Sequence, residues 1–141
     1  MTYQFFPYIS FPGNGREALT YYQSIFGGEL YLQDYPDVAT SEDNPFPFTP
    51  PENALAHGLL DAGTVQITGG DGIGEKLSKL DNDVYSFMIQ VDNVDEAREL
   101  ISRFVETGAS VAMSFEKAPW GSYYGQVKDK FGILWAFNAE C

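Results

Sequence analysis

One sequence design occurs twice in this chain, and the repeat limits the folds that the chain can adopt. Residues 14–30 read NGREALTYYQSIFGGEL, and residues 93–111 read NVDEARELISRFVETGASV. Each segment opens with Asn, has Glu three residues later, and reaches a glycine after a stretch of helical spacing. The opening predicts that the Asn side chain caps a helix and that the Glu side chain reaches back to it. Apolar residues form one stripe on each predicted helix: Ala18, Tyr22 and Ile25 on the first, and Val94, Ala97, Ile101 and Phe104 on the second.

Strand-like runs surround both predicted helices. Residues 3–11 and 84–91 precede them, and residues 29–35 and 110–115 follow them. Residues 57–68 and 126–138 each read as a hairpin with a glycine in the turn, Gly63 and Gly132. We therefore predict an α+β fold in which two tandem βαβββ modules form curved mixed sheets around a cleft. The modules span about 1–70 and 83–141 of a single domain, 1–141, and the Gly-rich stretch GGDGIGEKLSKLDND is predicted to be a linker.

Composition and charge exclude several classes of partner. The 141 residues include 20 acidic and 8 basic ones, a formal net charge of −12, which argues against nucleic acids and anionic membrane surfaces. The apolar runs are too short to span a bilayer. The single cysteine, Cys141, excludes a disulfide within the chain, so we expect a cytoplasmic protein.

Three segments carry a resemblance to a known family: residues 7–30, 56–68 and 120–138. They combine FGGEL with WG, YG and DKFG, and a Trp follows three residues after the last glycine. The chain resembles the PhnB-like branch of the vicinal oxygen chelate superfamily. This superfamily includes glyoxalase I, bleomycin- and fosfomycin-resistance proteins and extradiol dioxygenases.

The resemblance also implies where a metal would lie. Enzymes of the superfamily hold a divalent ion with His, Glu or Gln from four strands. The corresponding positions here are Pro7, Ser86, Ala136 and Ile67, with Gln66 one register away from Ile67. Pro, Ile and Ala offer no ligand atom, and a tight site needs three or four N, O or S donors. We therefore expect no metal at this position and no other cofactor.

His57 is the only histidine, and the hairpin turn decides which way it faces. If the turn is Asp61–Gly63, His57 lies opposite Ile67 on the cleft side. If the turn is only Ala62–Gly63, every side chain faces the other way. Glycine at the end of the triplet favours the longer turn and a cleft-facing His57. There it could donate to a ligand or act as a base, whereas the alternative is a packed histidine bonded to a neighbouring polar group.

Further ligand-binding candidates lie in the second half. If Phe87 and the alternate residues after it pack on the second helix, then Ser86, Met88 and Gln90 face the cleft. Trp120, Tyr123 and Tyr124 follow a Pro and a Gly, and some of them are expected at a cavity mouth, although core or dimer packing is the alternative. Asp129 is expected to form a turn.

The most direct functional hypothesis is a homodimeric binding module that takes a small organic molecule without metal. Two alternatives stay open: a metal-dependent lyase or isomerase of the glyoxalase type, and a resistance protein that sequesters a cationic drug. The proline-rich segment 36–53 contains Phe46 and Phe48, and two interpretations stay open: a lid anchored by one of these rings, or a mobile loop.

Overall fold

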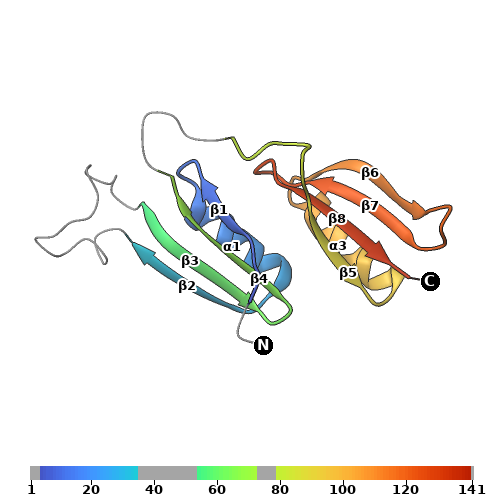
Figure 1. Cartoon of the computed structure of the whole chain (residues 1–141), viewed down its shortest axis with the longest axis horizontal. Coiled ribbons are helices and arrows are strands. Elements are labelled where there is room, and N and C mark those ends of the chain that lie inside the picture. Colours follow the sequence, from blue (N-terminus) through green and yellow to red (C-terminus); the bar gives the residue numbers. More distant parts are fainter. Residues whose placement is uncertain (1–3, 35–53, 73–78, 141) are drawn as a thin grey trace, which may run out of the picture. The chain divides into compact units, whose positions relative to one another are not determined.

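Helices and strands follow the same order in both halves of the computed structural model, which describes residues 4–34, 54–72 and 79–140 (Figure 1). The first half contains β1 (Tyr8–Phe11), α1 (Gly15–Phe26), β2 (Glu29–Asp34), β3 (Leu55–Ala62) and β4 (Val65–Asp71). The second half contains β5 (Phe87–Val91), α3 (Val94–Glu106), β6 (Ser110–Lys117), β7 (Tyr123–Lys128) and β8 (Leu134–Ala139). The predicted α+β fold with two tandem βαβββ modules is confirmed.

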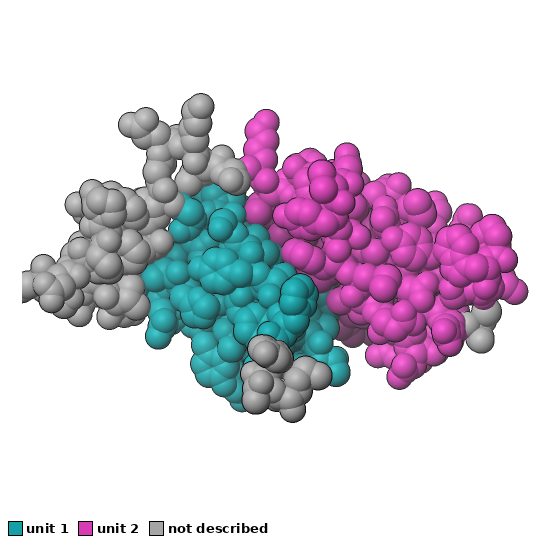
Figure 2. All heavy atoms as spheres, in the orientation of Figure 1, with its two compact units in different colours: residues 1–78 teal, residues 79–141 magenta. Residues whose placement is uncertain are grey.

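Each half forms one four-stranded mixed sheet. The strand orders are β1-β4-β3-β2 and β5-β8-β7-β6, so the two sheets have the same topology. In each sheet the first pair is parallel, β1 with β4 and β5 with β8, and the other pairs are antiparallel. The chain divides into two compact units, residues 1–78 (unit 1) and 79–141 (unit 2), which Figure 2 shows in separate colours.

The core of unit 1 lies between α1 and one face of its sheet. Leu19 and Tyr22 of α1 are fully buried, as are Leu60 of β3 and Ile67 of β4. The helix approaches the sheet closely because Gly58 has no side chain, since a Cβ there would lie 2.5 Å from Leu19 Cδ1. The apolar stripe predicted for residues 18–25 is thus the buried face of α1.

The core of unit 2 is built from aromatic rings between α3 and its sheet. Phe104 of α3 lies 5.5 Å from the ring of Trp135 and 6.0 Å from that of Phe137, measured between centroids. Phe87 of β5 meets Trp135 edge-on at 5.6 Å. Such tilted and edge-to-face pairs are the favoured arrangements of aromatic rings. The face of the sheet that carries these rings is therefore the one that α3 covers.

The two helices begin differently, although their sequences predicted the same cap. Asn93 has an extended backbone, and its side chain accepts a hydrogen bond of 2.7 Å from the Glu96 N–H, as predicted. Asn14 makes no such cap, so the prediction for α1 was wrong. Its backbone, at φ −113° and ψ 24°, lacks the extended conformation that a capping residue normally has.

The first residues of the predicted linker belong to β4 instead. Gly69, Gly70 and Asp71 pair with Ile9, Ser10 and Phe11 of β1 and are buried. Glycine is needed here because a Cβ at Gly69 would lie 2.6 Å from the backbone oxygen of Ile9. A closely packed strand therefore had the composition of a flexible link.

The β3–β4 hairpin differs from both turns that the sequence suggested. Ala62 pairs with Val65, which leaves Gly63 and Thr64 as a two-residue turn. Gly63 has φ +80° at the first turn position, where a type II′ turn favours glycine. The predicted lid, residues 36–53 with Phe46 and Phe48, lies outside the described residues. No helix in the described ranges has the length and apolarity to cross a membrane.

Candidate functional site

In each unit the helix covers one face of the sheet, and the other face is not covered by that helix (Figure 1). We call the face opposite α1 the open face of unit 1, and the face opposite α3 the open face of unit 2. Because side chains alternate along a strand, the buried rows next to each helix fix which residues lie on each open face.

Six side chains form two rows across the open face of unit 2: Gln90, Asn138 and Tyr124 in one row, and Met88, Ala136 and Gln126 in the next. The alternation predicted for residues 86–91 is the one observed, because Phe87 contacts Trp135 on the helix side. Met88 is 59% exposed, and Gln90 is exposed beside it. The face thus presents one large apolar side chain next to a row of neutral polar ones.

Hydrogen bonds fix the orientation of the polar row. Asn138 Nδ2 donates to Gln90 Oε1 at 2.9 Å, and Ser122 Oγ donates to Asn138 Oδ1 at 3.3 Å. Gln126 Nε2 donates to Tyr124 Oη at 3.0 Å. Within residues 79–140 the side-chain nitrogen of Gln90 has no further partner, so its two N–H groups are available to a bound molecule.

The open face of unit 1 carries a pair of stacked rings. Tyr8 of β1 and His57 of β3 have ring centroids 5.9 Å apart and ring planes inclined by 19°. The two strands are separated by β4, and Tyr8 reaches across it above Gly70. Tyr31 of β2 lies on the same face, opposite Leu59.

The sequence favoured a pairing of His57 with Ile67, and the structure does not show that pairing. Ile67 pairs with Leu60 and faces α1, whereas His57 pairs with Gln33 of β2 on the open face. The turn lies at Gly63 and Thr64, so the partner of each β3 residue is three positions further along β4 than expected, and an odd shift reverses the face assigned to Ile67. His57 is exposed and stacks on Tyr8, so it is not a packed core histidine.

The remaining predicted site residues are not brought together. Tyr123 pairs with Ala139 and contacts α3, where the guanidinium carbon of Arg98 lies 5.7 Å from its ring centroid. It therefore faces away from Met88 and Gln90. Trp120 is 71% exposed in the connection between β6 and β7, and Ser86 is half-buried just before β5.

Sequence reasoning missed two residues of the open faces, Tyr8 and Asn138, and it did not distinguish Tyr124 from Tyr123. A usable signal was present, because strict alternation places Asn138 on the face opposite Trp135 and Phe137. The same alternation separates Tyr124 from Tyr123. The strand pairing itself, which the sequence did not show, brings Asn138 next to Gln90.

The positions that the superfamily uses for metal binding do not offer a ligand set here. Ile67 faces the helix, and the backbone oxygen of Pro7 accepts hydrogen bonds from Thr68. Gln66 lies on the open face, where it pairs with Asp61. Among residues 4–34, 54–72 and 79–140, no three His, Cys, Asp or Glu side chains are close enough to hold an ion. The expected absence of metal stays a prediction.

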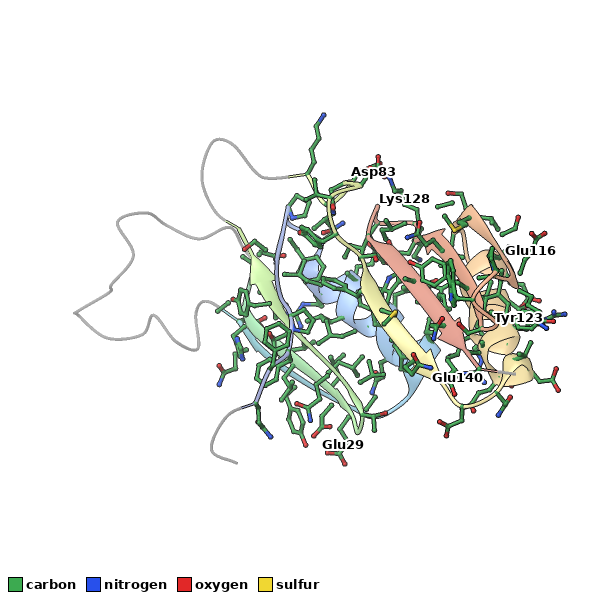
Figure 3. All side chains as sticks on the ribbon, turned by 45° about the vertical axis from the view of Figure 1, so that its right-hand side comes forward. Glu29, Asp83, Glu116, Tyr123, Lys128 and Glu140 are labelled. Carbon is green, nitrogen blue, oxygen red and sulfur yellow. The ribbon has the colours of Figure 1, made fainter. Side chains whose placement is uncertain are left out.

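The pKa values of Tyr31 in unit 1 and of Lys128 in unit 2 are shifted. The hydrogen bond from Tyr31 to the Glu29 carboxylate raises the pKa of the phenol, with the charges of Glu29 and Asp61 acting in the same direction. Hydrogen bonds to Asp81 and then to Asp83 raise the pKa of the Lys128 ammonium, against a smaller opposite effect of burial. Figure 3 shows Lys128 and Asp83 side by side. The two carboxylates offset the positive charge of Lys128 on β7.

Comparisons with known proteins agree with the architecture. The family model of the glyoxalase, bleomycin resistance protein and dioxygenase superfamily matches residues 7–137. Protein YjdN of Escherichia coli is 30% identical over 94% of this chain and 92% of its own. The structure of PA1353 from Pseudomonas aeruginosa superposes with a TM-score of 0.76 at 27% identity, covering 99% of this chain and 98% of its own. The structure of the PhnB protein from Bacillus cereus superposes with a TM-score of 0.67 at 15% identity, covering 97% of this chain and 99% of its own.

Proposed function

Because this chain belongs to the glyoxalase, bleomycin resistance protein and dioxygenase superfamily, we propose that it is a PhnB-like binding protein for a small organic molecule. The ligand binds on the open face of unit 2, next to Met88 and Gln90. The main support for this proposal is the polar row that hydrogen bonds hold in a fixed orientation beside the exposed side chain of Met88. Ligand sites commonly combine an apolar surface with a few fixed polar groups that set orientation.

The chemistry of this face favours a neutral ligand. None of the six side chains in the two rows is charged; Glu116 lies opposite Tyr124 at the β6 edge of the sheet, and Lys128 is paired with two carboxylates. Gln90 offers free N–H donors, and the Gln126 oxygen is an acceptor. A molecule with both acceptor and donor groups and an apolar part to contact Met88 would satisfy the face. This arrangement supports binding without a metal.

An NMR fragment screen tests the proposal. Neutral fragments should move the side-chain amide signals of Gln90, Gln126 and Asn138, while the side-chain amide of Gln23 on α1 stays unmoved. Gln90→Leu should weaken the tightest fragment by about 3- to 10-fold, the usual range for one lost hydrogen bond. Gln23→Leu, which changes a glutamine on α1 away from both open faces, is the control and should leave the affinity unchanged. If no fragment moves these amides at millimolar concentration, the proposal is wrong.

Metal content separates this function from a glyoxalase-type lyase or isomerase. The protein should purify without a stoichiometric divalent ion when no chelator is present. Its fragment affinities should also be unchanged by added Zn²⁺ or Mn²⁺. One tightly bound ion per chain would instead favour the enzyme. Binding that weakens steeply with salt would favour sequestration of a cationic drug.

We further propose that the chain forms a homodimer. Several large apolar side chains of unit 2 are exposed: Val84, Tyr85, Val111, Met113 and Trp120. Aromatic residues and Met are enriched at the centres of protein interfaces. Light scattering at micromolar concentration should give twice the mass of the chain. A monomeric mass would contradict this proposal.

A further inference from the structure

We propose that the stacked rings of Tyr8 and His57 form a binding platform for the planar aromatic ring of a neutral small molecule. The platform lies on the open face of unit 1. It does not depend on the function proposed for unit 2, because different residues carry it and different signals report on it. Its basis is the near-parallel stack of the two rings, 5.9 Å apart at 19°.

The backbone beneath the platform is shaped for this stack. A Cβ at Gly70 would lie 2.8 Å from Tyr8 Oη and 2.5 Å from the backbone oxygen of Ala56. Either distance is too short for a real side chain, so only glycine lets Tyr8 cross β4 to reach His57. The two ring planes are therefore aligned before any ligand arrives, which lowers the entropy that binding must overcome.

Hydrogen bonds hold the chain just before Tyr8. The backbone oxygen of Pro7 accepts from the Thr68 N–H at 3.1 Å and from Thr68 Oγ1 at 2.7 Å. Thr68 is itself buried and pairs with Tyr8 across the sheet. Two hydrogen bonds from Thr68 thus hold the residue that precedes Tyr8 against β4.

The rings remain accessible in the chain. Tyr8 is 56% exposed, and His57 is exposed as well. Ser10 and Gln33, their neighbours on this face, are neutral and exposed. A flat aromatic surface with neutral neighbours on the sheet stacks well with another aromatic ring. The chemistry therefore selects a neutral aromatic ligand.

The other possible occupant is an aromatic side chain of a second copy of the chain. Phe5 is 99% exposed three residues before Tyr8 and could serve in that role. The two occupants differ in how the site responds to protein concentration. A small ligand requires added compound, whereas a second copy would fill the site as protein concentration rises.

NMR can read this site directly because the chain has one histidine. The two carbon-bound protons of the His57 ring give unique signals, and 2-naphthol is a suitable probe with decahydro-2-naphthol as its saturated partner. We expect 2-naphthol to move both signals upfield with a saturable curve. The saturated compound should bind at least about 5-fold more weakly, because it lacks the stacking surface.

Variants assign the effect to the platform. Tyr8→Leu should weaken 2-naphthol by about 5- to 10-fold, the loss expected when one stacking ring is removed. Tyr31→Leu is the control, because Tyr31 lies on the same face and is 52% exposed, close to the exposure of Tyr8. This variant should leave binding unchanged. Gly70→Ala should abolish the shift. Because that variant could also unfold, Tyr8→Leu carries the test.

Three results would overturn the proposal. The first is that His57 signals stay unmoved at millimolar 2-naphthol. The second is equal binding of the saturated compound, or of 2-naphthol to the Tyr8→Leu variant. The third is movement of the same signals on dilution of the protein alone, which would assign the platform to a second copy of the chain.

Discussion

The carboxylate of Asp71 accepts a hydrogen bond of 2.7 Å from the backbone N–H of Gly15, the first residue of α1. The two residues are 56 positions apart, at the end of β4 and the start of the helix. The second carboxylate oxygen accepts from the Leu55 N–H at 2.9 Å, at the start of β3. One buried side chain thus joins three elements of unit 1 and supplies the helix cap that Asn14 does not.

Removing this carboxylate should therefore be costly. Asp71→Ala leaves two buried N–H groups without an acceptor, and we expect a loss of about 2–4 kcal/mol in the free energy of unfolding. Asp71→Asn keeps one acceptor oxygen and should lose about half as much. Urea unfolding followed by far-UV circular dichroism measures both. Equal stability of the wild type and Asp71→Ala would show that the two hydrogen bonds contribute nothing.

The two asparagines that precede the helices offer a matched comparison. Asn93→Ala removes a working cap and should cost about 1 kcal/mol. Asn14→Ala should change the free energy of unfolding by less than about 0.5 kcal/mol, because its side chain forms no cap and its buried oxygen has no hydrogen-bond partner among the described residues. Thermal unfolding of the two variants is the measurement. A larger cost at Asn14 than at Asn93 would contradict the structure.

These asparagines also show how far the sequence could predict the fold. The repeat located both helices and the strands around them, because periodicity and glycine stops depend on neighbouring residues. It also predicted identical caps, and there it failed. A cap depends on backbone angles and on competing acceptors, and for α1 the acceptor is Asp71, which is distant in sequence.

The candidate site was predicted less well, for a related reason. Met88 and Gln90 could be placed on an open face because alternation along one strand is local. Asn138 could not be joined to Gln90, since the pairing of β5 with β8 connects residues 48 positions apart. His57 depended on the turn, and one residue of turn length changes the facing of a whole strand. The Tyr8–His57 stack additionally needs a glycine on the strand between them.

Asp129 should stabilise the β7–β8 turn through three hydrogen bonds. Its carboxylate accepts from the N–H groups of Phe131 and Ile133, at 2.9 and 3.0 Å, and from Trp135 Nε1 at 2.9 Å. This agrees with the turn-forming role expected for it. Asp129→Ala leaves a buried indole N–H unpaired and should cost about 2–4 kcal/mol. Tryptophan fluorescence during urea unfolding measures the loss.

Two further variants test the role of Asp129. Asp129→Asn keeps an acceptor for the backbone N–H groups but turns a donor or a weaker acceptor toward Trp135. Its free energy of unfolding should therefore lie between those of Asp129→Ala and the wild type. Asp92→Ala removes an exposed acidic residue of the same unit, and its free energy of unfolding should stay within about 0.5 kcal/mol of the wild-type value. If all three variants unfold at the wild-type urea concentration, the buried carboxylate has no structural role.

Lys128 should make stability depend on pH only under alkaline conditions. Its hydrogen bonds to Asp81 at 2.7 Å and to Asp83 at 3.1 Å raise its pKa above the ordinary value of 10.5. A raised pKa means that the folded state holds the proton more tightly than the unfolded state. The stabilisation is therefore complete below pH 10.5 and disappears as pH rises through the folded-state value.

We expect the urea midpoint of Lys128→Gln to lie below that of the wild type by a constant amount from pH 7 to about 9.5. The difference should shrink above that range and also shrink in 1 M salt, where exposed charges are screened. Lys117→Gln removes the same charge from an exposed lysine on β6 and is the control, with a midpoint close to that of the wild type throughout. A midpoint difference for Lys128→Gln that grows with pH would show that the ion pair destabilises the fold.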